Sequence, residues 1–378
     1  PEPNPWDAYQ DFGHSHFHNA LIWGEGVEEV AIFGQGTIHG GGLSRNDPPV
    51  GGGDKAISLR ECRGVLIDGV RIEQGGHFAV LATGCEGVRL SGLTIRTTRD
   101  GVNIVGCRDV LLVRCDIESV RYENGVAKGG DDAIALKSDY SLGRRIDCTG
   151  VTVRDCRVAS GCNGFTIGSE TAGDFSDIRV ENLVIDQAEK AGIGITTNDG
   201  AVVDGVTCDG IVMRRVATPI FLHVTARLRT PEKRPVGRIR NVRFTGVEAS
   251  DCFGYAKGDA FASTLSGLAG AEIENVSFER VRITSKGGGR LENGEVEPPY
   301  TQEYTPRALG KRPAYGFYAR HVRGLSFRDV ELDFEQSDLR PAIFCRGVSG
   351  LRLENVRARR APEGAASVRA IDCDVELF

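Results

Sequence analysis

A short pattern of apolar and polar positions recurs along most of the chain. Each copy has an apolar residue, a second apolar residue two positions later, a pair of turn-forming residues and then an apolar-x-apolar triplet, as in VLIDGVRI from Val65. The alternation predicts short strands, the central Asp-Gly, Glu-Asn or Arg-Asp pairs predict tight turns, and no long segment with a helical period competes. Copies begin at Val30, Val65, Val88, Val110, Val151, Ile178, Val206, Val242, Val276, Leu325 and Leu351.

The copies follow one another at about 22 to 27 residues where no loop intervenes, and a second strand precedes each copy by about ten residues. A period of this length indicates a solenoid in which each turn buries its inner face against its neighbours. We therefore predict an all-β fold, a single-stranded right-handed parallel β-helix of about ten coils, forming one domain over residues 1–378. The pattern breaks at three loop insertions and continues on both sides of each: near 121–129, 252–270 and 286–313.

Polar residues stand just ahead of the second strand in most repeats. Because neighbouring coils stack at the strand spacing of ~4.8 Å, these residues are expected to form a column along one edge of the solenoid, on the scale of a bound sugar chain. Strict alternation would turn the acids in this column inward, so we expect a bend between each acid and the small residue after it, which glycine permits. The column contains His18 or Asn19, Lys55, His77, Asp100, Asp132, Asn163 and Ala191.

Composition and charge narrow the classes of function. The 50 glycines are about twice the usual share of roughly 7% and, lacking a collagen period, mark turns. The net charge of −6 argues against a nucleic-acid partner, and no run of eighteen apolar residues predicts a membrane span. Because the chain begins at Pro1, we expect a leader to have been removed and a secreted or periplasmic location. We also expect a monomer.

Eleven cysteines do not follow the spacing of a disulfide framework or a metal site. Five of them stand three residues before an apolar residue of their repeat, where a small hydrophobic side chain belongs in the core. No CxxC or Cys/His ligand spacing is present, so we expect mostly free thiols, no zinc and no cofactor. The five are Cys62, Cys85, Cys107, Cys148 and Cys345.

Two motifs with adjacent acids give the chain a family resemblance. GGDDAIALKS, with Asp131 and Asp132, matches the Gly-Asp-Asp motif of glycoside hydrolase family 28, the polygalacturonase-like enzymes, and TRDGVNI resembles that family's Asn-Thr-Asp-Gly motif. Asp100 matches in the second motif, while Thr98 and Arg99 depart. GVEEVAIFGQGTIHGGG is similar to the family's opening coil, so the resemblance runs from about residue 27 to 251.

The resemblance implies inverting hydrolysis of a glycosidic bond. Asp131 would protonate the leaving oxygen, and Asp100 and Asp132 would hold and deprotonate the attacking water. Inversion usually needs two carboxyl groups roughly 6.5–9.5 Å apart, and crowding of carboxylates is expected to raise the pKa of one of them, which suits that one to act as the acid. The structural alternative is that the Asp-Asp pair caps a turn.

Two further motifs depart from the family and affect the predicted substrate. SGCNGFTIGSE stands in place of Gly-His-Gly, with Cys162 or Asn163 where the histidine belongs, and AGIGITT replaces Arg-Ile-Lys with Gly194 and Thr196. The family's Arg and Lys are expected to bind a galacturonate carboxylate, so we expect a carbohydrate substrate that is pectin-related or similar and held by an altered subsite. Other residues are expected to contact it: Asn163, Lys137, His77, Lys55, Asn103 and His18.

Some alternatives remain open at this point. The three histidines of HSHFH, His14 to His18, would share one face of a strand and could hold a metal, line the groove or form hydrogen bonds. Glu170 is either a neighbour of the site or a surface acid. The competing functions are a polysaccharide lyase, which would use acids to bind Ca²⁺ and an Arg or Lys as base, and a non-catalytic glycan-binding β-helix.

Overall fold

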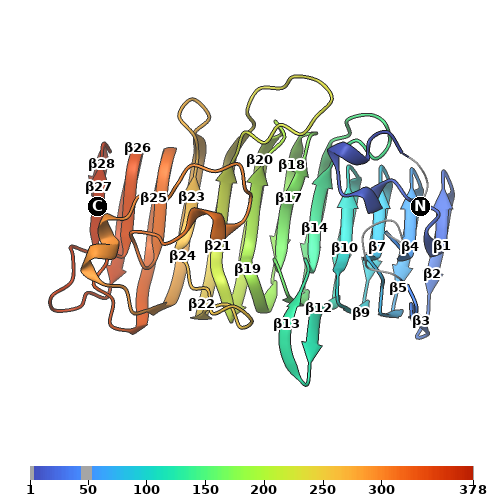
Figure 1. Cartoon of the computed structure of the whole chain (residues 1–378), viewed down its shortest axis with the longest axis horizontal. Helices are drawn as coiled ribbons and strands as arrows, with labels where there is room; N and C mark the ends of the chain where they lie inside the picture. Colours follow the sequence, from blue (N-terminus) through green and yellow to red (C-terminus); the bar gives the residue numbers. More distant parts are fainter. Residues whose placement is uncertain (1–3, 44–52, 378) are drawn as a thin grey trace.

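Strands of successive repeats pair in parallel and stack into three columns, so the chain coils as a right-handed parallel β-helix (Figure 1). The computed structural model describes residues 4–43 and 53–377. The first column, which carries the polar residues, contains twelve strands: β1 (Ala20–Glu25), β4 (Lys55–Arg60), β7 (Phe78–Thr83), β10 (Asp100–Val105), β14 (Ile134–Ser138), β17 (Phe165–Thr171), the end of β19 (Val184–Thr197), β21 (Val216–Val224), β23 (Ser263–Ser266), the starts of β25 (Phe317–Gln336) and β26 (Ile343–Ala358), and β27 (Val368–Ile371).

The recurring phrase of the sequence forms the other two columns. Its first part is the second column: β2 (Glu28–Phe33), β5 (Arg63–Asp68), β8 (Glu86–Ser91), β11 (Arg108–Val113), β15 (Cys148–Arg154), β18 (Phe175–Glu181), β20 (Val202–Arg214), β22 (Arg238–Cys252), β24 (Ile273–Gly287), the middle of β25 and β26, and β28 (Val375–Leu377). Its second part is the third column: β3 (Thr37–His39), β6 (Arg71–Glu73), β9 (Thr94–Thr97), β12 (Asp116–Glu123), β16 (Arg157–Ser160), the start of β19 and the ends of the long strands. The predicted fold is confirmed.

The turn between the second and third columns explains the polar pair at the centre of each phrase. Asn182 and Asp155 adopt positive φ values of 51° and 54°, a left-handed conformation that Asn and Asp tolerate better than most residues. The amide of Asn182 donates a hydrogen bond of 3.0 Å to the carboxylate of Asp155 one coil away. Stacked turns therefore stabilise each other as well as reversing the chain.

Inward-facing residues at equivalent positions stack along the solenoid axis. The rings of Phe244, Phe278 and Phe327 form one such stack, with centroids 5.1 Å apart at both contacts. All eleven cysteines are free thiols and ten are buried, which confirms their use as core residues. Burial raises the pKa of thiols such as Cys148 and Cys208, so they are poor nucleophiles.

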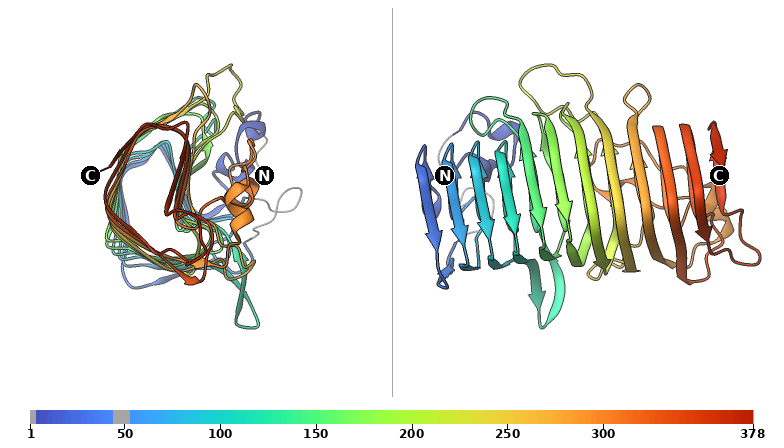
Figure 2. Two further views of the ribbon diagram at one scale, coloured as in Figure 1. Left: turned by 90° about the vertical axis from the view of Figure 1, so that its left-hand side faces the viewer. Right: turned by 180° about the vertical axis from the view of Figure 1, so that it is seen from behind.

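Segments outside the repeat gather on the side of the solenoid where the first column lies (Figure 2). The N-terminal segment, with the short helices η1 (Asp7–Tyr9) and η2 (Phe12–His14), and the insertion 286–313, with η3 (Leu291–Glu295) and η4 (Pro306–Leu309), both lie there. β12 extends into an antiparallel hairpin with β13 (Val126–Gly130), which is the insertion expected beside the acidic pair. The single domain over 1–378 stays a prediction, because it includes residues outside the described ranges.

Candidate active site

The three acids of the two motifs meet in one pocket at the start of the first-column strands. Asp100 opens β10, and Asp131 and Asp132 directly precede β14. Ala133 and Ile134 are consecutive and both belong to the core, so the alternation is broken at this point and the preceding acid faces out. The bend inferred from the sequence is therefore present.

Asp100 lies at the bottom of the pocket and is 3% exposed. The amide of Asn103 donates to its Oδ2 at 2.9 Å, and the ammonium of Lys137 lies 3.5 Å from the same oxygen. Burial, reinforced by the charge of Asp131, raises the pKa of Asp100 despite the opposing effect of Lys137. Asn103, three residues after Asp100, is fully buried and holds this acid, so the predicted substrate contact of Asn103 is replaced by a hydrogen bond to Asp100.

Asp132 is held by the next coil. Its Oδ1 accepts hydrogen bonds from the backbone N–H and the side-chain amide of Asn163, at 2.9 and 2.7 Å. The oxygen of that amide accepts from the N–H of Ala191 at 3.2 Å, which fixes the amide orientation. Burial, followed by the charge of Asp100, raises the pKa of Asp132.

Asp131 differs from the other two acids because an arginine binds it. Arg99 donates from Nη1 to Oδ2 of Asp131, and its Nη2 lies 3.7 Å from the carboxylate of Asp11 in the N-terminal segment. Burial alone would lower the pKa of Arg99, but the charges of Asp131, Asp100 and Asp11 outweigh it and raise the pKa. The hydroxyls of Ser119 and Ser160 both donate to the backbone carbonyl of Asp131 at 2.6 Å, so the turn that presents the acid is fixed.

Two lysines line the pocket together with the acids. Lys137 lies 3.5 Å from the carboxylates of both Asp100 and Glu170. Burial alone would raise the pKa of Glu170, but Lys137 and nearby arginines lower it well below its usual value, so this residue is a charged neighbour of the site. Lys190 lines the pocket as well, with its ammonium 5.7 Å from the ring centre of Tyr304.

Sequence reasoning missed several of these residues. Three of them lie outside the aligned column: Asp11 in the N-terminal segment, Lys190 within β19 one residue before Ala191, and Tyr304 in a loop insertion. Lys190 stands four residues before Gly194, one of the two positions where the family's basic residues are replaced, and that proximity was an available signal. Tyr304 and Asp11 carried none, because no repeat pattern covers them.

The structure places three further predicted substrate contacts away from the pocket. Lys55 is fully buried, and its ammonium donates to the backbone carbonyls of His16, at 2.7 Å, and Gly53. His77 is also fully buried; its Nε2 lies 2.7 Å from Nη2 of Arg99, so it contacts that arginine instead of the pocket. His18 is exposed on the surface, where its ring lies 3.4 Å from the carboxylate of Glu25.

The histidine cluster also differs from its prediction. Residues 14–18 form the end of η2 and a turn, so the histidines do not share a strand face. His14 pairs with Asp139 and His16 lies 3.3 Å from Asp7, each with its own acid. Among the described residues, the group suited to metal ligation is instead Asp131, Asp132 and Cys162, whose ligand atoms lie within 4.8 Å of one another.

That group does not fit the Ca²⁺ site of a lyase. Ca²⁺ takes six to eight oxygen ligands, whereas this group offers two carboxylates and a thiol. The charges of Lys190 and Lys137 offset part of the rise in the pKa of Asp132, and the same positive charges oppose a cation in the pocket.

Residues 9–298 match the family described as glycosyl hydrolases family 28. The chain belongs to this family. The assignment inferred from the Asp-Asp and Asp-Gly motifs is therefore confirmed, together with the enzyme class of that family, a glycoside hydrolase acting on O-glycosyl bonds.

Relatives and solved structures agree with the family. An endo-polygalacturonase of Pectobacterium carotovorum subsp. carotovorum is 22% identical over 302 residues, 74% of this chain and 69% of the relative. The family 28 exopolygalacturonase of Yersinia enterocolitica superposes with a TM-score of 0.54 at 14% identity, over 82% of this chain and 48% of the other. The exopolygalacturonase of Thermotoga maritima gives 0.50 at 21% identity, over 61% and 50%. The chain thus spans about half the length of these two solved proteins, and their likeness shows the fold.

No helix among the described residues is both long and apolar enough to cross a membrane. A carbohydrate substrate follows from the family, while the predicted monomer, the absence of a nucleic-acid partner and the secreted or periplasmic location stay predictions.

Proposed function

We propose that this protein hydrolyses a glycosidic bond of a pectin-related glycan, with Asp100, Asp131 and Asp132 as its catalytic residues. The observation that carries the proposal is the convergence of three carboxylates from two neighbouring coils on one pocket, each held by a different partner. A turn-capping pair would not need a third acid or the Asn163 and Asn103 amides aimed at the side-chain oxygens.

In the proposed reaction, Asp131 protonates the glycosidic oxygen while Asp100 and Asp132 hold a water molecule and remove its proton. The acids whose pKa values are raised are Asp100 and Asp132, whereas the expectation from crowding is a raised pKa for the acid that donates the proton. Their raised pKa values suit the role of base, because a carboxylate with a higher pKa is a stronger base at mildly acidic pH. Arg99 donates to Oδ2 of Asp131, so a glycosidic oxygen that takes its proton from that atom has to displace the arginine.

The pocket also supports an acidic substrate despite the loss of the family's Arg and Lys. Lys190 lies in the pocket near Gly194 and Thr196, and its ammonium can bind a uronate carboxylate from a different position on the solenoid. A charge-assisted hydrogen bond of this kind contributes about 1.5–3 kcal/mol. In the altered subsite, Lys190 therefore replaces the family's Arg and Lys as the cation that binds the substrate carboxylate. Galacturonate-containing glycans remain the proposed substrate class.

Stereochemistry is the part of the proposal that rests on the motifs and not on spacing. The carboxylate oxygens of Asp131 and Asp132 lie within 4.8 Å, below the roughly 6.5–9.5 Å of typical inverting pairs. The motif resemblance predicts inversion, with Asp100 and Asp132 sharing the water. Retention of the anomeric configuration would instead require one of the acids to act as a nucleophile.

The test is a screen of the purified protein against pectic and other plant oligosaccharides, with the first product anomer followed by NMR. Hydrolysis with inversion by the wild type, and its loss in Asp131→Asn, would support the proposal. An unsaturated product absorbing in the ultraviolet together with EDTA sensitivity would establish the lyase. Binding without turnover in both proteins would establish a glycan-binding module.

A further inference from the structure

The pocket is closed along the solenoid axis on the side of the first coils. The N-terminal segment crosses the first-column strands there and is fixed by several contacts: Trp6 stacks on Tyr140 with ring centres 5.9 Å apart, and His14, fully buried, pairs with Asp139. Asp11 of this segment is part of the pocket wall. A glycan lying along the column, as expected from the sequence, would collide with this segment.

The pocket is closed on the opposite side by the insertion 286–313. Leu309 of η4 is fully buried against Ala191 and Phe221 of the first-column strands, and Tyr304, just before η4, lines the pocket. Both segments lie on the same side of the solenoid in Figures 1 and 2. The enclosed space has a volume of about 130 Å³, well below the roughly 300–1,000 Å³ of pockets that enclose drug-sized ligands. It suits one sugar ring and not a chain passing through.

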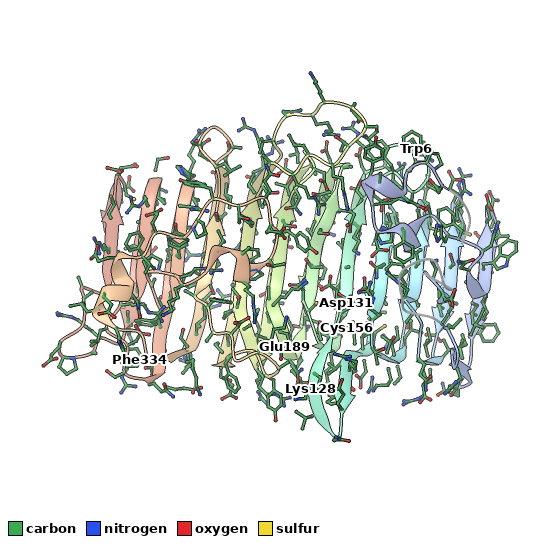
Figure 3. All side chains as sticks on the ribbon, viewed as in Figure 1. Trp6, Lys128, Asp131, Cys156, Glu189 and Phe334 are labelled. Atoms are coloured by element: carbon green, nitrogen blue, oxygen red, sulfur yellow. The ribbon has the colours of Figure 1, made fainter. Side chains whose placement is uncertain are left out.

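A second and wider hollow adjoins the pocket and shares Arg99 and Lys190 with it. Its volume is about 450 Å³, and it lies between the β12–β13 hairpin, the insertion 252–270 and η4. Figure 3 shows Lys128 on that hairpin, below Asp131 and near Glu189. We call this hollow the basic groove, since six cationic side chains line it: Arg99, Arg121, Lys128, Lys190, Lys257 and Arg307.

Three of these six cations have ion-pair partners, namely Arg99 with Asp131, Arg121 with Glu123 and Arg307 with Asp259, whereas the groove lining itself contains only the acids Glu189 and Asp259. Asp259 is engaged by Arg307, and Glu189 accepts backbone hydrogen bonds from Tyr255 and Ala256 at 2.6 and 2.9 Å. Lys128 and Lys257 are exposed, and within the described part of the chain neither ammonium has an ion-pair partner. A net positive groove on a protein of net charge −6 attracts a polyanion to one place.

We infer that an anionic glycan binds with its terminal sugar in the closed pocket and its following sugars in the basic groove, so that the protein removes sugar units from a chain end. The inference rests on the proposed hydrolysis for its catalytic part, and the binding part stands without it. The chemistry that recognises the ligand is a row of carboxylates on a sugar chain against Lys128 and Lys257, the two exposed groove lysines for which no ion pair is found among the described residues.

The binding test uses Asp131→Asn protein, to prevent turnover, and galacturonates of one, two and four units in calorimetry. Affinity is expected to rise at least about tenfold from one unit to four, and Lys128→Ala/Lys257→Ala is expected to remove most of that rise without changing the affinity for the monomer. The control Lys233→Ala/Lys311→Ala removes two exposed lysines that line neither hollow and should leave the whole series unchanged. An equal affinity for all lengths, or an equal effect of both double variants, would overturn the inference.

The cleavage test follows products of a galacturonate polymer digested by wild-type protein. One small product from the first time point, with a slow fall in viscosity, is expected from action at a chain end; a ladder of intermediate lengths at early times would contradict it. If no glycan yields a product while the length-dependent binding persists, the proposed hydrolysis is wrong and the binding of an anionic glycan in the basic groove is retained.

Discussion

Arg99 donates a hydrogen bond to Asp131, the acid proposed to protonate the leaving group, and it stands where the family motif has a threonine. The same guanidinium lies between Asp131, Asp11 and His77, so it connects the catalytic turn to the N-terminal segment that closes the pocket. Through Arg99, the N-terminal segment therefore contributes to the electrostatics of the catalytic acids.

Replacement of this arginine should shift the acidic limb of the pH–rate profile. The charge of Arg99 lowers the pKa of Asp100, so Arg99→Thr raises that pKa further and leaves the base protonated up to a higher pH. The acidic limb of kcat/KM is therefore expected to move to higher pH, while Arg99→Lys, which keeps the charge, moves it less. Superimposable profiles for wild type and Arg99→Thr would show that Asp100 does not titrate in the reaction.

Asp132→Asn is expected to abolish activity and to stabilise the fold at neutral pH. The folded protein raises the pKa of Asp132, so it binds the proton more tightly than the unfolded chain does, and stability falls as pH rises from about 3.9 through the folded pKa. The amide removes that cost and keeps an oxygen to accept from Asn163. Urea unfolding at pH 7 and pH 3.5 measures the effect, which should vanish at the lower pH.

A matched control is Asp372→Asn, in an exposed turn with φ of 53°. It should change neither activity nor the pH dependence of stability. Loss of stability in Asp132→Asn at pH 7 would mean that Asp132 is a structural carboxylate whose ionised form supports the fold.

The repeat explains which site residues the sequence could predict. Asp100, Asp132 and Asn163 occupy the same register in consecutive coils, so the period that predicts the fold also brings them together. Lys55 occupies that register too, but in the next coil the position belongs to Phe78, and His77, aligned there from the sequence, stands one residue earlier. The N-terminal segment packs over these coils, so Lys55 and His77 are buried supports. Register predicts which side chains are neighbours and carries no information about which of them a distant segment covers.

The cationic residues of the site also could not all be predicted from the register of the repeats. Lys190 lies within β19, one residue before the column residue Ala191, while Lys257 and Arg307 belong to insertions whose path is set by nonlocal packing. The sequence identified where these insertions occur and that the hairpin near 121–129 would border the site. It could not place two loops, separated by about fifty residues, on the same groove, because no pattern relates them.

Removal of the Asn163 side chain should slow the reaction through Asp132. Asn163→Ala deletes the 2.7 Å hydrogen bond from Nδ2 and leaves only the backbone donor. A hydrogen bond to a charged group contributes about 1.5–3 kcal/mol, so kcat is expected to fall roughly ten- to a hundredfold. Because Asn163 stabilises the ionised form of Asp132, the acidic limb of the profile should also move to higher pH.

That shift separates a positioning role from a structural one. A variant that merely loosened the fold would lower kcat at every pH and leave the limb in place. Asn163→Gln, with an amide on a longer side chain, serves as the comparison and is expected to restore part of the rate.

Lys190 is expected to decide between acidic and neutral substrates. Its ammonium lies in the pocket beside Tyr304, near the two positions where the family's basic residues are missing. Lys190→Ala should raise KM for a galacturonate oligosaccharide about tenfold or more, since a lost charge-assisted hydrogen bond of about 1.5–3 kcal/mol acts on binding, while Lys190→Arg retains most of the affinity. The corresponding neutral galactose oligosaccharide, assayed in parallel, should be bound weakly by both proteins and almost equally. If Lys190→Ala weakened the binding of neutral and acidic ligands alike, the lysine would be supporting the pocket wall. The substrate carboxylate would then have to be bound by Lys137, whose ammonium already lies beside two acids and is therefore the weaker hydrogen-bond donor to an anion.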